Sequence, residues 1–543
     1  MKRSICEIAM VVGLVLGVFA GDAAAWGPRA QQAIAAASIQ LVRKSVPSAF
    51  KTDLVNYEED ILRGALMGPG ALQAFVPLNS EREALAAVGS EIQLMREVKL
   101  SGIGSYACYR MGIISALVAD LVLPYGMAWS KHEAELQARI ESDIDKAVDS
   151  YRFDPAGRRR QFIRDPEEYF ARRRGFYEED KKMIADDYAR GEGFGGFLAK
   201  GGEAYFGRAI EAVTDAWYTM LRTEEDFGDS APTQVVLSRY FLSEVAYLLN
   251  QKRNIYQADK AYEHFAAANP GLMNLYEEVG DLYYAYGTEA AKERGVREWR
   301  IAFSHAGPHR ESVASKLANH YRRVGEAKFE HAFGPTSREE DLREAREAIQ
   351  TALEFEPSRQ ALAQLLNDVN VAIAEREERR QLAVDIVAAA EKVMKEADRL
   401  RMDGKFSDAI RRYNDAVGLF GNVSDEFDEQ NNAAKNNVKQ INLRIREVIN
   451  TILDRASDKI TEGEEMLEGH RWDDAAAAFQ QAKEIVKDIP EGEAAYKMNK
   501  ENVITEAERK LSQVEERKQR YEEDQRRRAA AAAAAQQAAT QPQ

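Results

Sequence analysis

Histidine is a common metal ligand and proton carrier in proteins, and this chain contains few. It has seven histidines in 543 residues, and only His132 precedes residue 225. His305 and His309 have the i, i+4 spacing that would place two imidazoles on one helical face, where they could bind a metal ion. Gly307 and Pro308 stand between them and break the helix that would align them. The pair therefore does not predict a metal site.

A glycine-rich segment is the second candidate. GEGFGG at Gly191–Gly196 matches G-x-G-x-x-G, but it follows a polar helical stretch and not a strand. A nucleotide-binding turn needs the strand–turn–helix context, so the segment indicates a flexible loop. The sequence also contains no Walker lysine motif, no G-x-S-x-G elbow and no H-E-x-x-H.

Two arginine clusters, Arg158–Arg160 and Arg172–Arg174, flank an acidic patch with aromatic residues between them. Such clusters could make peripheral contact with anionic membrane headgroups or with a polyanion. The simpler interpretation, which we prefer at this stage, is a solvated helix with local ion pairs.

The composition predicts a globular, helical protein of two to four domains. Hydrophobic residues make up 45% and charged residues 30%, which excludes wholesale disorder. Leu, Ala, Glu and Arg are abundant, and these residues favour helices. The net charge is −15, and an acidic surface argues against nucleic acid as a partner, because phosphate contacts need clustered positive charge.

The start of the chain predicts export. Lys2 and Arg3 precede the apolar run Ile8–Ala20, and Ala23 and Ala25 form an A-x-A cleavage signal. We expect residues 1–25 to be a signal peptide and the protein to reach the periplasm, the cell surface or the medium. The alternative is an uncleaved anchor, but the apolar run is short for a membrane span.

After cleavage one cysteine remains, so no internal disulfide is expected. Cys108 lies in an apolar helical stretch, where it is expected to be a buried small hydrophobe. The apolar stretch Met111–Trp129 carries Asp120 at its centre, which is costly in lipid. We therefore expect a buried core helix there and not a membrane span.

A pattern with a period of 34 residues recurs from about residue 239. Small residues at fixed positions would let two antiparallel helices approach closely, and large apolar residues would fill the space between neighbouring pairs. The expected packing residues are Ala246, Tyr262, Pro270, Gly280, Ala318, Ala397, Gly404, Ala409, Tyr413, Gly463, Trp472, Ala475 and Phe479.

This pattern resembles the tetratricopeptide repeat family over residues 239–490. The two last copies match it well, while the first three are irregular and residues 362–391 lie outside the register. The resemblance implies an α-solenoid scaffold whose concave face binds a protein or peptide. The expected parts are 26–238 (helical domain), 239–361 (irregular repeats), 362–391 (helical spacer), 392–495 (repeats), 496–528 (charged helix) and 529–543 (disordered Ala/Gln-rich tail).

Residues 26–225 resemble the zinc-dependent phospholipase C and S1/P1 nuclease family in the order and texture of YEEDILRGAL, ADLVLPYG and RAIEAVTDAWYTML. In that family the mature N-terminal tryptophan binds zinc through its amine and carbonyl. Histidine and carboxylate side chains from several helices hold three zinc ions, which activate water. The resemblance implies Trp26, Asp60 and Asp120 as counterparts of ligands, with Glu135 near the position of another.

The family's histidines are missing at the matching positions. Gln31, Ala116 and Gly126 stand where histidines are expected, Lys131 occupies another such place, and His132 is one residue out of register. Three zinc ions cannot be assembled from one imidazole and scattered carboxylates. The resemblance therefore implies a catalytically silent relative, with no cofactor expected and a single zinc ion near Trp26 as the alternative.

Together these observations predict an all-α exported protein: a phospholipase-like helical domain, a repeat solenoid and a charged C-terminal helix. The expected role is protein–protein interaction or scaffolding, and not catalysis. Two alternatives remain open at this stage, a residual metal-dependent phosphodiesterase or phospholipase and a membrane-surface adaptor. The sequence does not determine the partner's identity or the oligomeric state.

Overall fold

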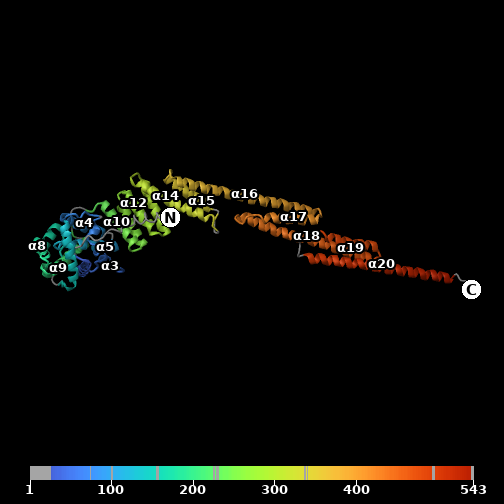
Figure 1. The fold of residues 1–543 in the computed structure, drawn as a ribbon, viewed down its shortest axis with the longest axis horizontal. Coiled ribbons are helices and arrows are strands. Elements are labelled where there is room, and N and C mark those ends of the chain that lie inside the picture. The colour runs from blue at the N-terminus through green and yellow to red at the C-terminus, as the bar shows by residue number, and fades with distance from the viewer. Residues whose placement is uncertain are drawn as a thin grey trace. The chain divides into compact units, whose positions relative to one another are not determined.

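The structure is a computed structural model (Figure 1). It describes residues 26–73, 75–99, 102–154, 158–175, 177–223, 225, 227, 231–334, 338, 340–491 and 496–539. The expected signal peptide, residues 1–25, lies outside the described residues.

The all-α prediction is confirmed. In the described ranges every regular element is a helix, apart from one isolated antiparallel bridge between Lys51 and Asn56. None of the helices described is both long enough and apolar enough to cross a membrane. The chain divides into two compact units: the first runs to His320 and includes Glu354–Glu356, and the second comprises Tyr321–Leu353 and the chain from Pro357 onward.

The first unit is built around two helices that are buried along most of their length. They are α5 (Ser105–Leu121) and α9 (Phe197–Leu221). The buried face of α5 includes Cys108 and Asp120, as expected for a core helix. The surrounding helices are α2 (Pro28–Ser45), α3 (Glu58–Ala65), α4 (Glu81–Lys99), α6 (Lys131–Ala147), α7 (Pro166–Arg174) and α8 (Tyr177–Ala189), with short 3₁₀ turns at Pro69–Leu72, Val148–Ser150 and Gly193–Gly195.

Local sequence signals fix where several of these helices begin. The Ser130 hydroxyl accepts a hydrogen bond from the N–H of Glu133 at the start of α6, and Asp165 does the same for Glu168 in α7. Pro166 follows as the first residue of α7, a position where its missing N–H costs nothing. Such caps satisfy N–H groups that have no partner within the helix.

Two helical hairpins of the repeat region belong to the first unit. They are α10 (Gln234–Asn250) with α11 (Ile255–Ala268), and α12 (Met273–Tyr286) with α13 (Glu289–Phe303). The Tyr240 ring lies 5.1 Å from that of Tyr106 on α5, and the Tyr247 hydroxyl donates to Asp60 on α3. Because of these contacts the hairpins share one hydrophobic core with the preceding helices. The units therefore divide within α14 (His309–His331), and not between residues 238 and 239.

The second unit consists of helices that pack in groups of three. They are α15 (Asp341–Phe355), α16 (Gln360–Met402), α17 (Phe406–Phe420), α18 (Asp428–Glu468), α19 (Trp472–Val486) and α20 (Lys497–Ala539). The C-terminal part of α16 packs with α17 and the start of α18, while the rest of α18 packs with α19 and α20. Residues 362–391, expected to be a separate spacer, lie inside the continuous α16.

The two three-helix groups have the same register. Their short helices α17 and α19 are both 15 residues long, and their first residues, Phe406 and Trp472, lie 66 positions apart. The same separation joins Gly404 and His470, which adopt left-handed conformations with φ of 73° and 62° in the preceding turns. Glycine adopts this conformation without a steric penalty and histidine at some cost, so the turn geometry is kept even where glycine is not.

Ion pairs between the long helices recur with the same separation of 66 residues. The Arg444 guanidinium lies 2.6 Å from the Asp398 carboxylate, 46 positions earlier, and Lys510 pairs with Glu464 at the same sequence offset. The first pair joins α16 to α18, and the second joins α18 to α20. Asn437 and Glu391 have the same offset about two turns earlier along both helices, which shows that α16 and α18 run parallel.

The C-terminal segment differs from the expectation. Helix α20 continues to Ala539, through most of the stretch expected to be a disordered tail. Alanine and glutamine are good helix formers, so the charged helix has no sequence signal at which to stop.

Candidate functional site

The counterparts of zinc ligands in the first unit do not form one cluster. The Trp26 side chain is fully buried and its indole N–H donates to the carbonyl of Ala119, at 3.0 Å. The Gln31 amide donates to Asp120 Oδ1 at 3.2 Å, from the position where the family resemblance implies a histidine. These three side chains lie together at one end of α5.

Asp60 lies elsewhere. Its carboxylate accepts a hydrogen bond from the Tyr247 hydroxyl at 2.7 Å and pairs with Lys252 Nζ at 2.6 Å. It lies near Cys108, three turns of α5 away from Asp120, and burial raises the pKa of the Cys108 thiol. Asp60 thus ties the first repeat hairpin to the core.

Glu135 is exposed on α6, as is His132. Among the residues that the structure describes, no group of three or more His, Cys, Asp or Glu side chains is placed to hold a metal ion. The donor set does not fit the zinc cluster of the resembled family, and we derive no chemistry through such a cluster.

His305 and His309 do not share a helix. Helix α13 ends at Phe303 and α14 begins at His309. His309 Nε2 lies 2.9 Å from the carbonyl oxygen of Ala302, and His305 Nδ1 lies 3.2 Å from that of Ile301. Both rings therefore bind the end of α13, which is a structural role.

Several of the expected repeat-packing residues lie where helices cross. Gly280 lies against Trp299 and Gly295, and Gly463 lies against Phe479, so closely that a Cβ would clash. The buried members are Gly280, Ala318, Ala397, Ala409, Tyr413, Gly463, Ala475 and Phe479; Ala246, Tyr262 and Trp472 are half-buried, and Pro270 and Gly404 are exposed. Gly404 provides a left-handed turn and not a close contact.

Two members of the arginine clusters, Arg173 and Arg174, are partly buried and form an internal network, while Arg158, Arg159 and Arg172 are exposed. Arg173 pairs with Glu211, lies 2.8 Å from Asp215 and donates to the Tyr169 hydroxyl. Burial raises the pKa of Asp215, and the hydrogen bonds it accepts oppose that shift. Arg174 pairs with Glu81 and donates to the carbonyl of Leu121 at the end of α5.

A large cavity opens beside this network. It has a volume of about 680 Å³ and lies between the end of α7, the middle of α9 and the segment around Phe153. We call it the basic cavity, because its lining includes six basic side chains and three acidic ones: Arg152, Arg158, Arg172, Arg173, Lys200 and Arg208, with Asp154, Glu203 and Glu211. The sequence placed some of these arginines in clusters but gave no signal that joined them to α9.

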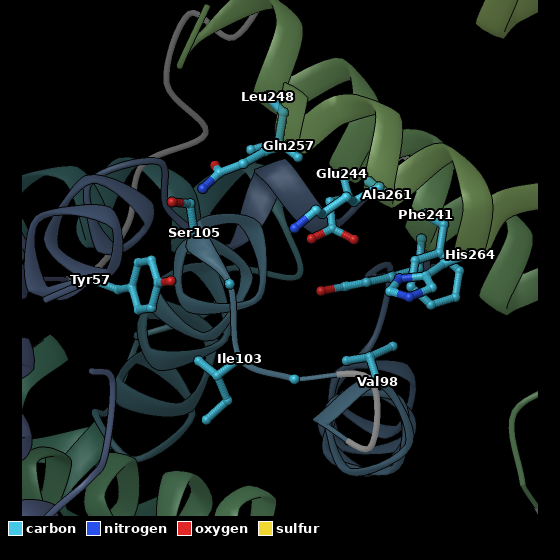
Figure 2. A pocket seen from close by; sticks show the side chains of 14 residues that line it. Tyr57, Val98, Ile103, Ser105, Phe241, Glu244, Leu248, Gln257, Ala261 and His264 are labelled. Carbon is cyan, nitrogen blue, oxygen red and sulfur yellow. The ribbon is translucent and has the colours of Figure 1, made fainter. Parts of the chain in front are cut away.

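A second, smaller pocket surrounds Glu244 on α10 and has a volume of about 180 Å³ (Figure 2). Figure 2 shows the Glu244 carboxyl group facing open space, with Tyr57 and Ser105 on one side and Phe241 and His264 on the other. No hydrogen bond or ion pair from a described residue reaches this carboxylate. We call this the Glu244 pocket.

Burial raises the pKa of Glu244 to about 7. The group therefore gains or loses its charge near neutral pH. Lys260 and His264 also line the pocket, but among the described residues neither forms an ion pair with Glu244. Sequence analysis missed Glu244, because α10 and α11 meet distant residues there: Tyr57 just before α3, Val98 on α4 and the segment leading into α5.

Comparison with known proteins gives no relative. No protein-family model, no curated protein sequence and no solved structure matches this chain. A function must therefore be argued from the residues themselves.

Proposed function

We propose that this chain is an exported, non-enzymatic interaction protein whose repeated helical hairpins bind another protein or a peptide. The observation that carries the proposal is the packing register that recurs after 66 residues in the second unit. Repeated units that contact only their neighbours produce a long surface from small local cores, and such surfaces are suited to binding macromolecules. The resemblance to tetratricopeptide repeats supports the same role.

A groove in the second unit is the best place for a partner. Two adjoining cavities of about 240 and 430 Å³ share Arg376 and Glu426, which lie 3.4 Å apart. Phe333 lines the smaller cavity and remains 67% exposed, although its ring contacts Phe329. We call this the Arg376 groove. A partner could bury Phe333 while its polar groups meet the charged centre, as protein interfaces commonly do.

The test is affinity capture with the full mature chain, comparing two exposed aromatic positions. Phe333→Glu should abolish retention of the partner that the unaltered chain captures. Tyr256→Glu is the matched control, because Tyr256 is also 67% exposed but lies in the first unit. Equal retention by both variants and the unaltered chain would rule out the Arg376 groove, and no saturable partner at all would rule out the function.

Export is tested separately. The proposal requires the exported protein to begin at Trp26, which N-terminal sequencing of material recovered outside the cytoplasm would show. A chain that retains Met1 and stays in the cytoplasm would contradict it.

The enzymatic alternative rests on one observation, the proximity of Trp26 and Asp120 through Ala119 and Gln31. Under our proposal, metal analysis of the purified mature protein finds well under one zinc ion per chain. Stoichiometric zinc together with chelator-sensitive phosphodiesterase activity would establish the alternative instead.

A further inference from the structure

The basic cavity contains more positive charge than its own acidic residues neutralise. Its acids are engaged with part of the lining: Glu211 pairs with both Arg158 and Arg173. The Glu203 carboxylate accepts a hydrogen bond from the backbone N–H of Arg152 at 2.7 Å. These contacts position part of the cavity wall and orient two of its guanidinium groups.

Three basic side chains of the lining are left without a strong partner. Arg208 Nη1 is buried without a hydrogen-bond acceptor among the described residues, and the only polar partner of the Arg208 side chain in that part of the chain is Tyr205, whose ring lies 4.9 Å from the guanidinium. Lys200 forms no ion pair within the described part of the chain, and Arg172 has one exposed contact with Glu168, at 3.8 Å. A buried N–H without an acceptor costs free energy that a bound anion would recover.

The chemistry of these groups selects the ligand. Guanidinium groups present parallel N–H donors that match the oxygens of a phosphate, and a lysine ammonium adds a point charge. The chain as a whole has a net charge of −15, whereas the lining of this concave site has a surplus of positive charge. Random surface charge would be expected to follow the net charge.

We propose that the basic cavity binds a phosphate group, through Arg208 and Lys200 with Arg172 at its edge. The Arg158–Glu211–Arg173 network positions the walls and does not supply the free charge. The phosphate is either a soluble ion or ester, or the headgroup of a phosphomonoester lipid. This site is separate from the Arg376 groove, so its failure would leave the interaction role untouched.

The test uses the full mature chain and inorganic phosphate at low ionic strength, with binding measured by calorimetry and chloride as the control anion. Arg208→Gln and Lys200→Gln should each weaken binding about tenfold or more, because each removes a charge-assisted hydrogen bond. Arg159→Gln is the matched control, since Arg159 belongs to the same cluster but does not line the cavity. It should leave binding unchanged.

A parallel measurement distinguishes the source of the phosphate. Vesicles of phosphatidylcholine with and without phosphatidic acid are titrated with the same variants. Binding of phosphatidic acid vesicles alone, lost in Lys200→Gln but kept in Arg159→Gln, supports a lipid headgroup. No binding in either assay, or an equal loss in Arg159→Gln, overturns the site. Circular dichroism checks whether the Arg208→Gln variant is folded. If that variant is unfolded, the Lys200→Gln variant, which changes an exposed side chain, still tests the site.

Discussion

Among the described residues, buried charged side chains are concentrated in the first compact unit, while Asp341 is the buried one in the second. In the first unit, charges are buried and networked: Arg110 and Glu91 form a double hydrogen bond, with side chains only 3% and 2% exposed. In the second unit, ion pairs such as Arg444–Asp398 lie at partly exposed positions between parallel helices. Most of the buried side chains described in the first unit belong to one core, whereas those described in the second divide among several smaller ones.

This difference determines how far the loss of stability caused by a substitution spreads in each unit. Removing one member of a buried pair leaves the other charge without water or partner, and the whole core bears the cost. In a chain of hairpins each group contacts only its neighbours, so damage stays local. The predictions below test this contrast, beginning with the largest expected effect.

Arg110→Met should destabilise the first unit by about 3–5 kcal/mol, because it leaves the Glu91 carboxylate buried and unpaired. Scanning calorimetry should show an early transition for this unit and an unshifted one for the second. The double variant Arg110→Met, Glu91→Leu should recover most of the loss, since it removes both charges. An equal shift of both transitions would show that the units unfold as one.

Phe479→Ala should cost about 3 kcal/mol, because it opens a cavity at a fully buried position, but only within its own three-helix group. Hydrogen exchange should lose protection in α19 and the facing part of α20 while α17 stays protected. Tyr413→Ala, 66 positions earlier, is the matched variant and should give the reverse pattern. Loss of protection in both groups from either variant would contradict local cores.

Glu244→Gln should raise the free energy of unfolding by about 2 kcal/mol at pH 8. The Glu244 pKa is raised from 4.5 to about 7 in the folded state, so the folded protein holds this proton more tightly. The stabilising contribution is fully present below pH 4.5 and is lost as the pH rises through 7. Urea unfolding between pH 4.5 and 8 should show a decline in the free energy of unfolding of the unaltered chain. If the same decline persists in Glu244→Gln, another group causes it.

Lys510→Met should have the smallest effect, about 0.5 kcal/mol, and Arg444→Met about the same, since partly exposed ion pairs contribute little. Their unfolding midpoints should move toward the unaltered value as salt is added to both proteins. A loss comparable to that of Arg110→Met would erase the distinction between the units.

The features that the sequence predicted correctly are those encoded locally. Helix periodicity and composition gave the all-α class, and the apolar surroundings of Cys108 indicated its burial. The sequence marked Gly463 and Phe479 as packing residues, and the structure places them in contact between neighbouring helices of one hairpin.

Features that depend on distant segments were not predicted. A 34-residue frame missed the 66-residue unit, because it divided α16 and α18 at places where the helices continue. Arg208 and Glu244 carry no motif of their own. The neighbours of Arg208 come from α7 and from the segment around Arg152, and those of Glu244 include the distant Tyr57. The first hairpin of the expected repeat region, α10 with α11, is tied to the first core, because the Tyr247 hydroxyl donates to Asp60.

The sharing of α18 between two groups restricts how the chain can change in length during evolution. Inserting one residue in the middle of this helix would turn its second half by about 100° and move every later packing face away from its partner. Duplication or deletion of a complete block between equivalent turns would preserve all the contacts. We therefore expect natural variation in this part of the chain to come as whole blocks, with short insertions confined to the turns.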